Sequence, residues 1–233
     1  MPALSLLPAP TMYLFWHTVT RLGEAQLLLP ALLAVTAWLA LRAQAPRVAL
    51  VWLSTTAVAA LLTTATKIAF IGYGLGYAPL DFTGISGHAM FSAAILPLLA
   101  RETVGAAHPR WHAPAVLVGV ALAALVAVSR VKVHAHSPSE SWAGFLLGCT
   151  ASLLALRWVQ LPPVSAPKKL LLIVGAWLAV AVAGAPPSRT HDWVTRLSVA
   201  LSGAPEPYTR WHMHRDWRRL NGPVGGAVNA PLR

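Results

Sequence analysis

The sequence has few charged residues and very few acidic ones. Only 11% of its 233 residues are charged, whereas 56% are hydrophobic. Soluble domains carry roughly 25% charged residues, so this composition excludes a disordered chain and disfavours an ordinary soluble globular domain. The single cysteine, Cys149, excludes a disulfide scaffold. A bundle of membrane-spanning helices is therefore the first hypothesis.

The shortage of acidic residues leaves a large positive charge. Seven Asp and Glu face 18 Lys and Arg, which gives a net charge of +11. In a soluble protein this excess would indicate nucleic-acid binding. Here few charges lie inside the apolar runs, and seven arginines lie in the last 45 residues. We interpret the charge as membrane-flanking and tail charge, and we expect no nucleic-acid partner.

Long apolar runs are abundant, and each ends at a basic residue or at proline. A membrane-spanning helix needs about 20 mostly apolar residues, so the shorter runs must extend into their flanks. We expect an all-α integral membrane bundle of about six transmembrane helices within a domain covering 27–185. The runs cover 27–41, 48–66, 89–100, 113–128, 141–156 and 170–185.

The two ends of the chain differ from this domain. The segment 1–26 contains the aromatic, amphipathic stretch 12–17, which predicts an interfacial N-terminal helix rather than a span. The segment 186–233 is polar and contains Trp193, Trp211 and Trp217, which indicates an extramembrane C-terminal tail on the bilayer surface.

The loop charges predict an orientation. The loops 42–47, 101–112 and 157–169 carry seven Lys and Arg, and the loops 67–87 and 129–138 carry three. The positive-inside rule places the first set in the cytoplasm. The second set of loops would then lie on the outer side. In a bacterial inner membrane, which is the location we expect, that is the periplasmic side. The tail arginines would then also lie outside, against the same rule.

Three polar clusters belong to that second face: Lys67, the stretch 83–88 and the stretch 129–140. Together they hold three basic side chains, histidines, hydroxyls, a carboxylate and a glycine-bearing turn. These are the groups needed to bind a phosphate and attack it.

The stretch 83–88 predicts a helix start. Ser86 fits an N-cap whose oxygen accepts a hydrogen bond from the first turn. Free backbone N–H groups at such an end attract an anion, and Gly87 allows close approach. His88 would then face the bound group. The alternative is a capped helix with an interfacial histidine.

The stretch 129–140 contains a capping box, with Ser137 as N-cap, Pro138 at N1 and Glu140 at N3. Glu140 could also turn back to hold the imidazole of His136, which would raise the basicity of its other nitrogen. Arg130 offers a planar fork for two phosphate oxygens, or it snorkels to the interface.

Two further patterns have simple interpretations. His134 and His136 could form a metal pair, but a metal site needs a third and a fourth ligand, and Cys149 lies too deep in its helix; we expect no metal. Gly144 and Gly148 have the small-xxx-small spacing that packs a neighbouring helix closely.

These residues resemble the type 2 phosphatidic acid phosphatase family, which shares its site with vanadium haloperoxidases. The family's third signature is Ser-Arg, five residues, His, three residues and Asp. It fits Ser129-Arg130, His136 and Glu140, with one carboxylate replacing another. The resemblance covers roughly 27–152.

The other two signatures fit less fully. The second, Pro-Ser-Gly-His, fits 85–88 without the proline. The first, Lys followed after six residues by Arg-Pro, fits only at Lys67, because Gly74 and Leu75 occupy the other two positions. Another cation would have to replace the missing arginine, and Lys132 is the nearest candidate in the sequence.

The resemblance implies a phosphohistidine mechanism without cofactor. His136 attacks phosphorus, Glu140 orients His136, and His88 protonates the leaving oxygen. Lys67, Arg130, Ser86 and the Gly87 amide hold the phosphate oxygens. Phosphoryl transfer depends mainly on such positioning and charge stabilisation.

We therefore expect a membrane phosphatase whose partners are membrane lipids and a lipid phosphate or pyrophosphate substrate. Phosphatidic acid, phosphatidylglycerol phosphate and isoprenyl diphosphates all fit, and the sequence sets no oligomeric state. Two alternatives stay open: a lipid phosphotransferase that uses the same site, and a non-enzymatic membrane protein with a degenerate site.

Overall fold

The computed structural model describes residues 9–43, 45–104, 108–158, 167–184 and 189–221. Within these residues the fold is all-α, as predicted, with only an isolated bridge between Tyr77 and Phe82. The α-helices are α1 (Ala9–Arg21), α2 (Ala25–Leu41), α3 (Pro46–Tyr73), α4 (Gly87–Glu102), α5 (His112–Lys132), α6 (Pro138–Trp158), α7 (Lys168–Gly184), α8 (Thr190–Ser202) and α9 (Arg210–Asn221). Two 3-10 turns, η2 (Ala78–Leu80) and η3 (Pro109–Trp111), lie between them.

Each predicted apolar run forms a helix, α2 to α7. Three segments are long and apolar enough to cross a membrane, namely Thr11–Leu41, Pro46–Tyr73 and Pro109–Lys132. Large apolar side chains on the outer faces are solvent-exposed, including Leu61 at 69% and Leu117 at 67%. An apolar exterior is what a hydrocarbon surrounding requires, and the count of about six spans stays a prediction.

Helix α4 lies at the centre of the bundle and packs against α2, α3, α5 and α6. Its side chains Met90, Ala93 and Ile95 are fully buried. Gly144 and Gly148 of α6 lie directly against the α4 backbone, at the carbonyl oxygens of Ser86 and Met90, where a Cβ atom would clash. The small-xxx-small prediction is therefore confirmed, and this close contact fixes the start of α6 beside the start of α4.

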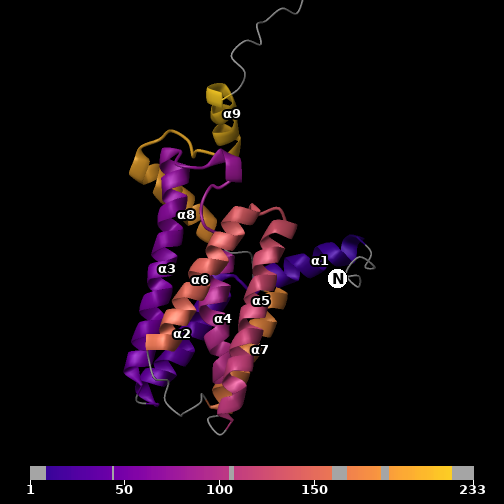
Figure 1. Ribbon diagram of the computed structural model, residues 1–233, viewed down its shortest axis with the longest axis vertical. Helices are drawn as coiled ribbons and strands as arrows, with labels where there is room; N and C mark the ends of the chain where they lie inside the picture. The colour runs from indigo at the N-terminus through magenta and orange to yellow at the C-terminus, as the bar shows by residue number, and fades with distance from the viewer. Residues whose placement is uncertain (1–8, 44, 105–107, 159–166, 185–188, 222–233) are drawn as a thin grey trace, which may run out of the picture.

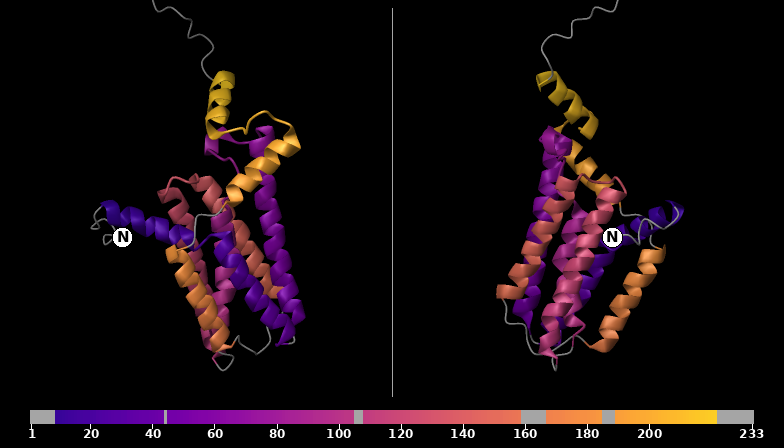
Figure 2. Two further views of the ribbon diagram at one scale, coloured as in Figure 1. Left: turned by 180° about the vertical axis from the view of Figure 1, so that it is seen from behind. Right: turned by 45° about the vertical axis from the view of Figure 1, so that its right-hand side comes forward.

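Helix α3 is longer than the apolar run that predicts it. The helix continues past Lys67 to Tyr73 and ends at Gly74, which adopts a left-handed conformation with φ of 70°. Lys67 thus lies within the helix rather than at its end. The upper end of α3 projects beyond the ends of α5 and α6, and α8 and α9 lie beside it (Figures 1 and 2).

The described parts of the N-terminal and C-terminal segments fold against the bundle. Helix α1 lies across the bundle axis (Figure 1) and packs against α5. Helix α8 packs against α3, and α9 contacts η2. The segment predicted to be a surface tail therefore contributes two helices at the upper end of the bundle, with α8 beside α3 and α9 beyond it (Figure 1).

Candidate active site

A pocket of about 560 Å³ opens where α3 ends and α4 begins. The predicted residues that line it are Lys67, Gly87, His88, Arg130 and His136. They come from α3, the first turn of α4, the last turn of α5 and the connection to α6. The structure thus brings together side chains that lie up to 69 positions apart in the sequence.

The end of α5 aims His136 into this pocket. His134 is left-handed, with φ of 55°. The N–H of His134 donates to the Val131 carbonyl at 3.1 Å, and the N–H of Ala135 donates to the Arg130 carbonyl at 3.0 Å. This is the hydrogen-bond pattern of a Schellman cap. His134 therefore ends the helix and is itself exposed, whereas His136 turns inward.

His136 and Glu140 form a close pair. Nδ1 of His136 lies 2.7 Å from Oε2 of Glu140, and the Glu140 side chain is completely buried. A carboxylate on Nδ1 fixes the tautomer that carries its proton there. The lone pair on Nε2 is then the nucleophilic position of the ring.

The same carboxylate also caps α6. The N–H of Ser137 donates to Oε2 of Glu140 at 3.0 Å, and the N–H of Glu140 donates to Oγ of Ser137 at 3.3 Å. The predicted capping box is confirmed, and it coexists with the contact to His136. The helix cap therefore holds the carboxylate in place beside the histidine.

Burial lowers the pKa of His136, and the nearby Lys67 and Arg130 lower it further. The hydrogen bond to Glu140 acts in the opposite direction. Because burial has the largest effect, the pKa of His136 lies below the ordinary value for histidine, about 6.5. The neutral imidazole is therefore favoured at neutral pH. A neutral ring is the form that can act as a nucleophile.

Arg130 turns into the protein rather than toward the interface. Its Nη1 donates to Oγ1 of Thr20 at 2.8 Å, and its buried Nε has no hydrogen-bond partner among the described residues. Thr20 belongs to α1, so the N-terminal segment supports a residue of the pocket. Sequence reasoning missed this contact because 110 positions separate the two residues.

Ser86 departs from the expected geometry. It is the N-cap of α4, but its side chain makes no capping hydrogen bond. Its Oγ is buried and has no partner within the described residues, and Ser86 is not among the residues that line the pocket. Its N–H instead donates to the Glu140 carbonyl at 3.1 Å, because α6 packs so closely here. The structure places Ser86 behind the wall of the pocket.

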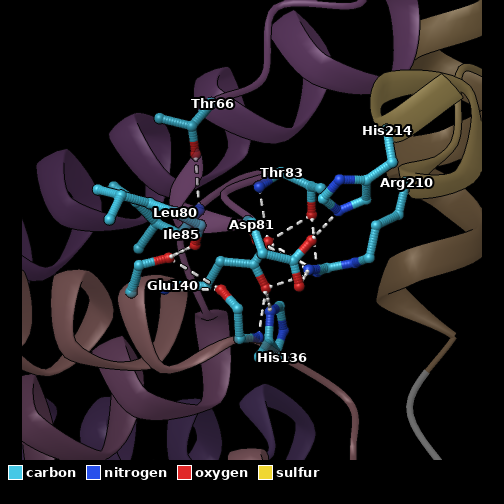
Figure 3. A network of polar contacts seen from close by, with 11 residues as sticks. Thr66, Leu80, Asp81, Thr83, Ile85, His136, Glu140, Arg210 and His214 are labelled. Atoms are coloured by element: carbon cyan, nitrogen blue, oxygen red, sulfur yellow. Dashed lines mark hydrogen bonds and ion pairs between the residues drawn. The ribbon is translucent and has the colours of Figure 1, made fainter. Parts of the chain in front are cut away.

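The proposed substitute cation is also in a different place. Lys132 is exposed and does not line the pocket, because it lies beyond the inward-facing Arg130 at the end of α5. Arg210 of α9 lines the pocket instead. Its Nη2 lies 2.9 Å from Oε1 and 3.0 Å from Oε2 of Glu140 (Figure 3).

Two residues of the connection between η2 and α4, Thr83 and Asp81, complete this network. Thr83 donates its N–H to Oε1 of Glu140 at 2.6 Å, and its hydroxyl donates to the same oxygen. Asp81 forms an ion pair with Arg210 and lies 2.7 Å from Nε2 of His214. Sequence reasoning included Thr83 in a cluster without a role and missed Asp81, Arg210 and His214. No local spacing relates them to the motifs.

No group of three metal-ligating side chains occurs among the residues that the structure describes. His134 and His136, considered as a metal pair, serve different contacts: His134 ends α5 and His136 pairs with Glu140. The basic side chains that line the pocket are Lys67, Arg130 and Arg210.

Comparisons with known proteins give a family model and a relative that match this chain. The family model of the PAP2 superfamily matches residues 73–162, which include His88, Arg130, His136 and Glu140. A protein of Klebsiella pneumoniae, described as an uncharacterized 22.5 kDa protein in the cps region, is 32% identical over 213 residues. The alignment covers 86% of this chain and 98% of that protein. No solved structure matches the chain.

The family assignment follows from two observations together. The alignment covers 86% of this chain and nearly all of the relative, and the family model covers the segment that carries two of the three signatures. Members of this superfamily are phosphatases, which supports the hydrolysis of phosphoric esters in general. The chain belongs to the PAP2 superfamily.

Proposed function

We propose that the protein is a membrane-bound phosphatase that hydrolyses a lipid phosphate or lipid pyrophosphate through a phosphohistidine on His136. The observation that carries this proposal is the 2.7 Å contact between His136 and Glu140 at the edge of a pocket lined by Lys67, His88 and Arg130. Candidate substrates are phosphatidic acid, phosphatidylglycerol phosphate and isoprenyl diphosphates.

The reaction proceeds in two displacements. Nε2 of His136 attacks phosphorus, the bond from phosphorus to the leaving oxygen breaks, and His88 donates a proton to that oxygen. Water then attacks the phosphorus of the phosphohistidine, His88 takes a proton from the water, the bond from phosphorus to Nε2 breaks, and inorganic phosphate leaves. Splitting one hard step into two is the benefit of a covalent intermediate, and general acid help contributes about 10²–10⁴-fold.

The charges in the pocket suit a phosphoryl group. Lys67 and Arg130 offer cations, and the N-terminus of α4 at Gly87 offers backbone N–H groups. The unsatisfied Nε of Arg130 is a donor that a phosphate oxygen would satisfy.

The surroundings of the pocket favour a lipid as the substrate. Phe70, Ile71 and Phe91 line it together with the polar residues. The pocket lies at one end of a bundle that contains three helical segments able to cross a membrane. A phosphorylated head group could bind there while its chains stay in the bilayer, and we propose that this end faces the periplasm of a bacterial inner membrane.

The test is a panel of lipid phosphates with the purified protein in detergent, with released inorganic phosphate as the readout. Wild type should release phosphate from at least one lipid without an added acceptor, which separates a hydrolase from a phosphotransferase. His136→Ala should release none. His134→Gly is the matched control, because glycine suits the left-handed position of His134. No release from any lipid, or release by His136→Ala, would refute the proposal.

A further inference from the structure

We propose that Arg210 is a positioning residue of the active site: from α9 it holds Glu140, and through Glu140 it holds the imidazole of His136. This inference rests on the proposed function. It adds a residue of the C-terminal segment, outside the three signatures, to the reaction.

Glu140 accepts hydrogen bonds from several segments of the chain. Oε1 accepts from the N–H and hydroxyl of Thr83, and Oε2 accepts from the N–H of Ser137 and lies against Nδ1 of His136. Nη2 of Arg210 reaches both oxygens. Arg210 is therefore the permanently charged residue that ion-pairs directly with this carboxylate in the described part of the chain.

The need for such a cation follows from burial. The Glu140 side chain is 0% exposed, and a buried carboxylate must be paired and hydrogen-bonded to stay ionised. A charge-assisted bond from arginine also restricts the carboxylate's direction. If the carboxylate turned, Nδ1 of His136 would lose its hydrogen-bond partner. Nε2 would then no longer be held pointing at the phosphorus atom.

Arg210 is itself held firmly. Its Nη1 donates to the Asp81 carbonyl at 2.7 Å, and its guanidinium pairs with the Asp81 carboxylate. Asp81 also lies 2.7 Å from Nε2 of His214, one turn further along α9. Asp81, directly after η2, thus contacts α9 at two residues one turn apart, Arg210 and His214, as Figure 3 shows.

The apolar contacts below α9 fix it to α3. Met213 is buried in a small cluster with Phe70 and Ile71, and the Tyr208 ring packs edge-on to Phe70 with centroids 5.6 Å apart. The N–H of Tyr208 donates to the Ile71 carbonyl at 2.8 Å. These contacts hold the segment that carries Arg210 independently of the carboxylate.

The experiment compares Arg210→Ala with the matched control Arg215→Ala on the same helix. Arg215 contacts Asp216 and the Trp211 ring and does not line the active-site pocket. Arg210→Ala should lower kcat at least tenfold with KM changed less than threefold. Arg210→Lys, which keeps the charge without the fork, should fall between alanine and wild type. Arg215→Ala should stay within twofold of wild type.

A second measurement does not depend on turnover. In histidine-labelled protein, the Nδ1–H resonance of His136 is assigned by its loss in His136→Ala. Arg210→Ala should shift it and Arg215→Ala should not. If the wild type released no phosphate but Arg210→Ala still shifted the His136 resonance, the positioning role would stand and the proposed function would fail. An unmoved resonance, wild-type kcat in Arg210→Ala, or a loss confined to KM would overturn the inference.

Discussion

At the residue scale, Glu140 combines two contacts that are usually made by different side chains. It caps α6 through Ser137 and it bonds His136. Because it is completely buried, its charge persists only through its donors. Replacing that carboxylate therefore affects both the stability of the fold and the chemistry, and the two effects can be measured separately.

Glu140→Gln should lower turnover by about 10²-fold or more, since a misplaced imidazole loses its alignment. The amide NH₂ would face N–H donors, so unfolding should also become easier by about 1–3 kcal/mol. Glu140→Asp keeps the charge and should retain more activity. The control is Ser139→Ala in the same turn. The Ser139 hydroxyl donates to the Leu80 carbonyl at 2.7 Å rather than to His136. Turnover and thermal unfolding are the measurements. Full activity with lowered stability in Glu140→Gln would leave only the capping role.

The pKa of His136 gives a prediction with a definite sign. Burial lowers this pKa below the ordinary value of about 6.5, so the neutral ring is the major form at pH 6.5. A histidine NMR titration, with His136 assigned by comparison with His136→Ala, should show a midpoint under 6.5. The folded state disfavours protonation here, so this group also reduces stability as the pH falls below 6.5. A midpoint above 6.5 would show that Glu140 outweighs burial.

At the element scale, the turn between α1 and α2 packs against the site at His88. A Cβ atom at Gly23 would lie 2.8 Å from the His88 carbonyl oxygen and 2.9 Å from its Cβ. Thr20, in the last turn of α1, accepts a hydrogen bond from Arg130. The N-terminal segment is therefore packed against two residues of the pocket, in addition to any contact with the interface.

Gly23→Ala should reduce turnover at least tenfold, because the added methyl group must displace His88 or the turn. Gly175→Ala in α7 is the matched control, since a Cβ there meets nothing within 4 Å. The assay is phosphate release by both purified variants. Wild-type turnover in Gly23→Ala would mean that the turn moves without disturbing His88.

The helices and the centre of the site could be predicted from the sequence for different physical reasons. Apolar runs set α2 to α7, and the spacing of His136 and Glu140 across a helix N-cap is a local geometry that sequence encodes directly. Arg210 lies 70 positions from Glu140 and Thr20 lies 110 positions from Arg130. Contacts of that kind depend on how elements pack, and no periodicity or local motif signals them.

The hydrogen bonds of Ser86 also depend on how the helices pack, and they could not be predicted from the sequence. Its place at the helix start followed from residue type, as the structure shows. Its side chain makes no capping bond, whereas its N–H bonds the Glu140 carbonyl of the closely packed α6. Neighbouring helices thus decide which local hydrogen bonds form.

At the scale of the whole molecule, the proposed orientation can be tested by labelling. In a Cys149→Ala background, Leu75→Cys should react with a membrane-impermeant thiol reagent on intact cells, and Thr103→Cys should react only after the membrane is opened. Both positions are exposed and lie at opposite ends of the bundle, after α3 and after α4. The reversed pattern would place the pocket in the cytoplasm and remove outer-leaflet lipids as substrates.

The most direct test of the central claim is the covalent intermediate itself. Wild-type protein is mixed with a ³²P-labelled lipid phosphate that it hydrolyses, quenched in base within milliseconds and digested, and the labelled peptide is sequenced. The account predicts an acid-labile, base-stable phosphate on His136, formed without added metal and in the presence of a chelator, because Lys67 and Arg130 supply the cations. Label on another residue, or label that requires a divalent metal, would contradict it.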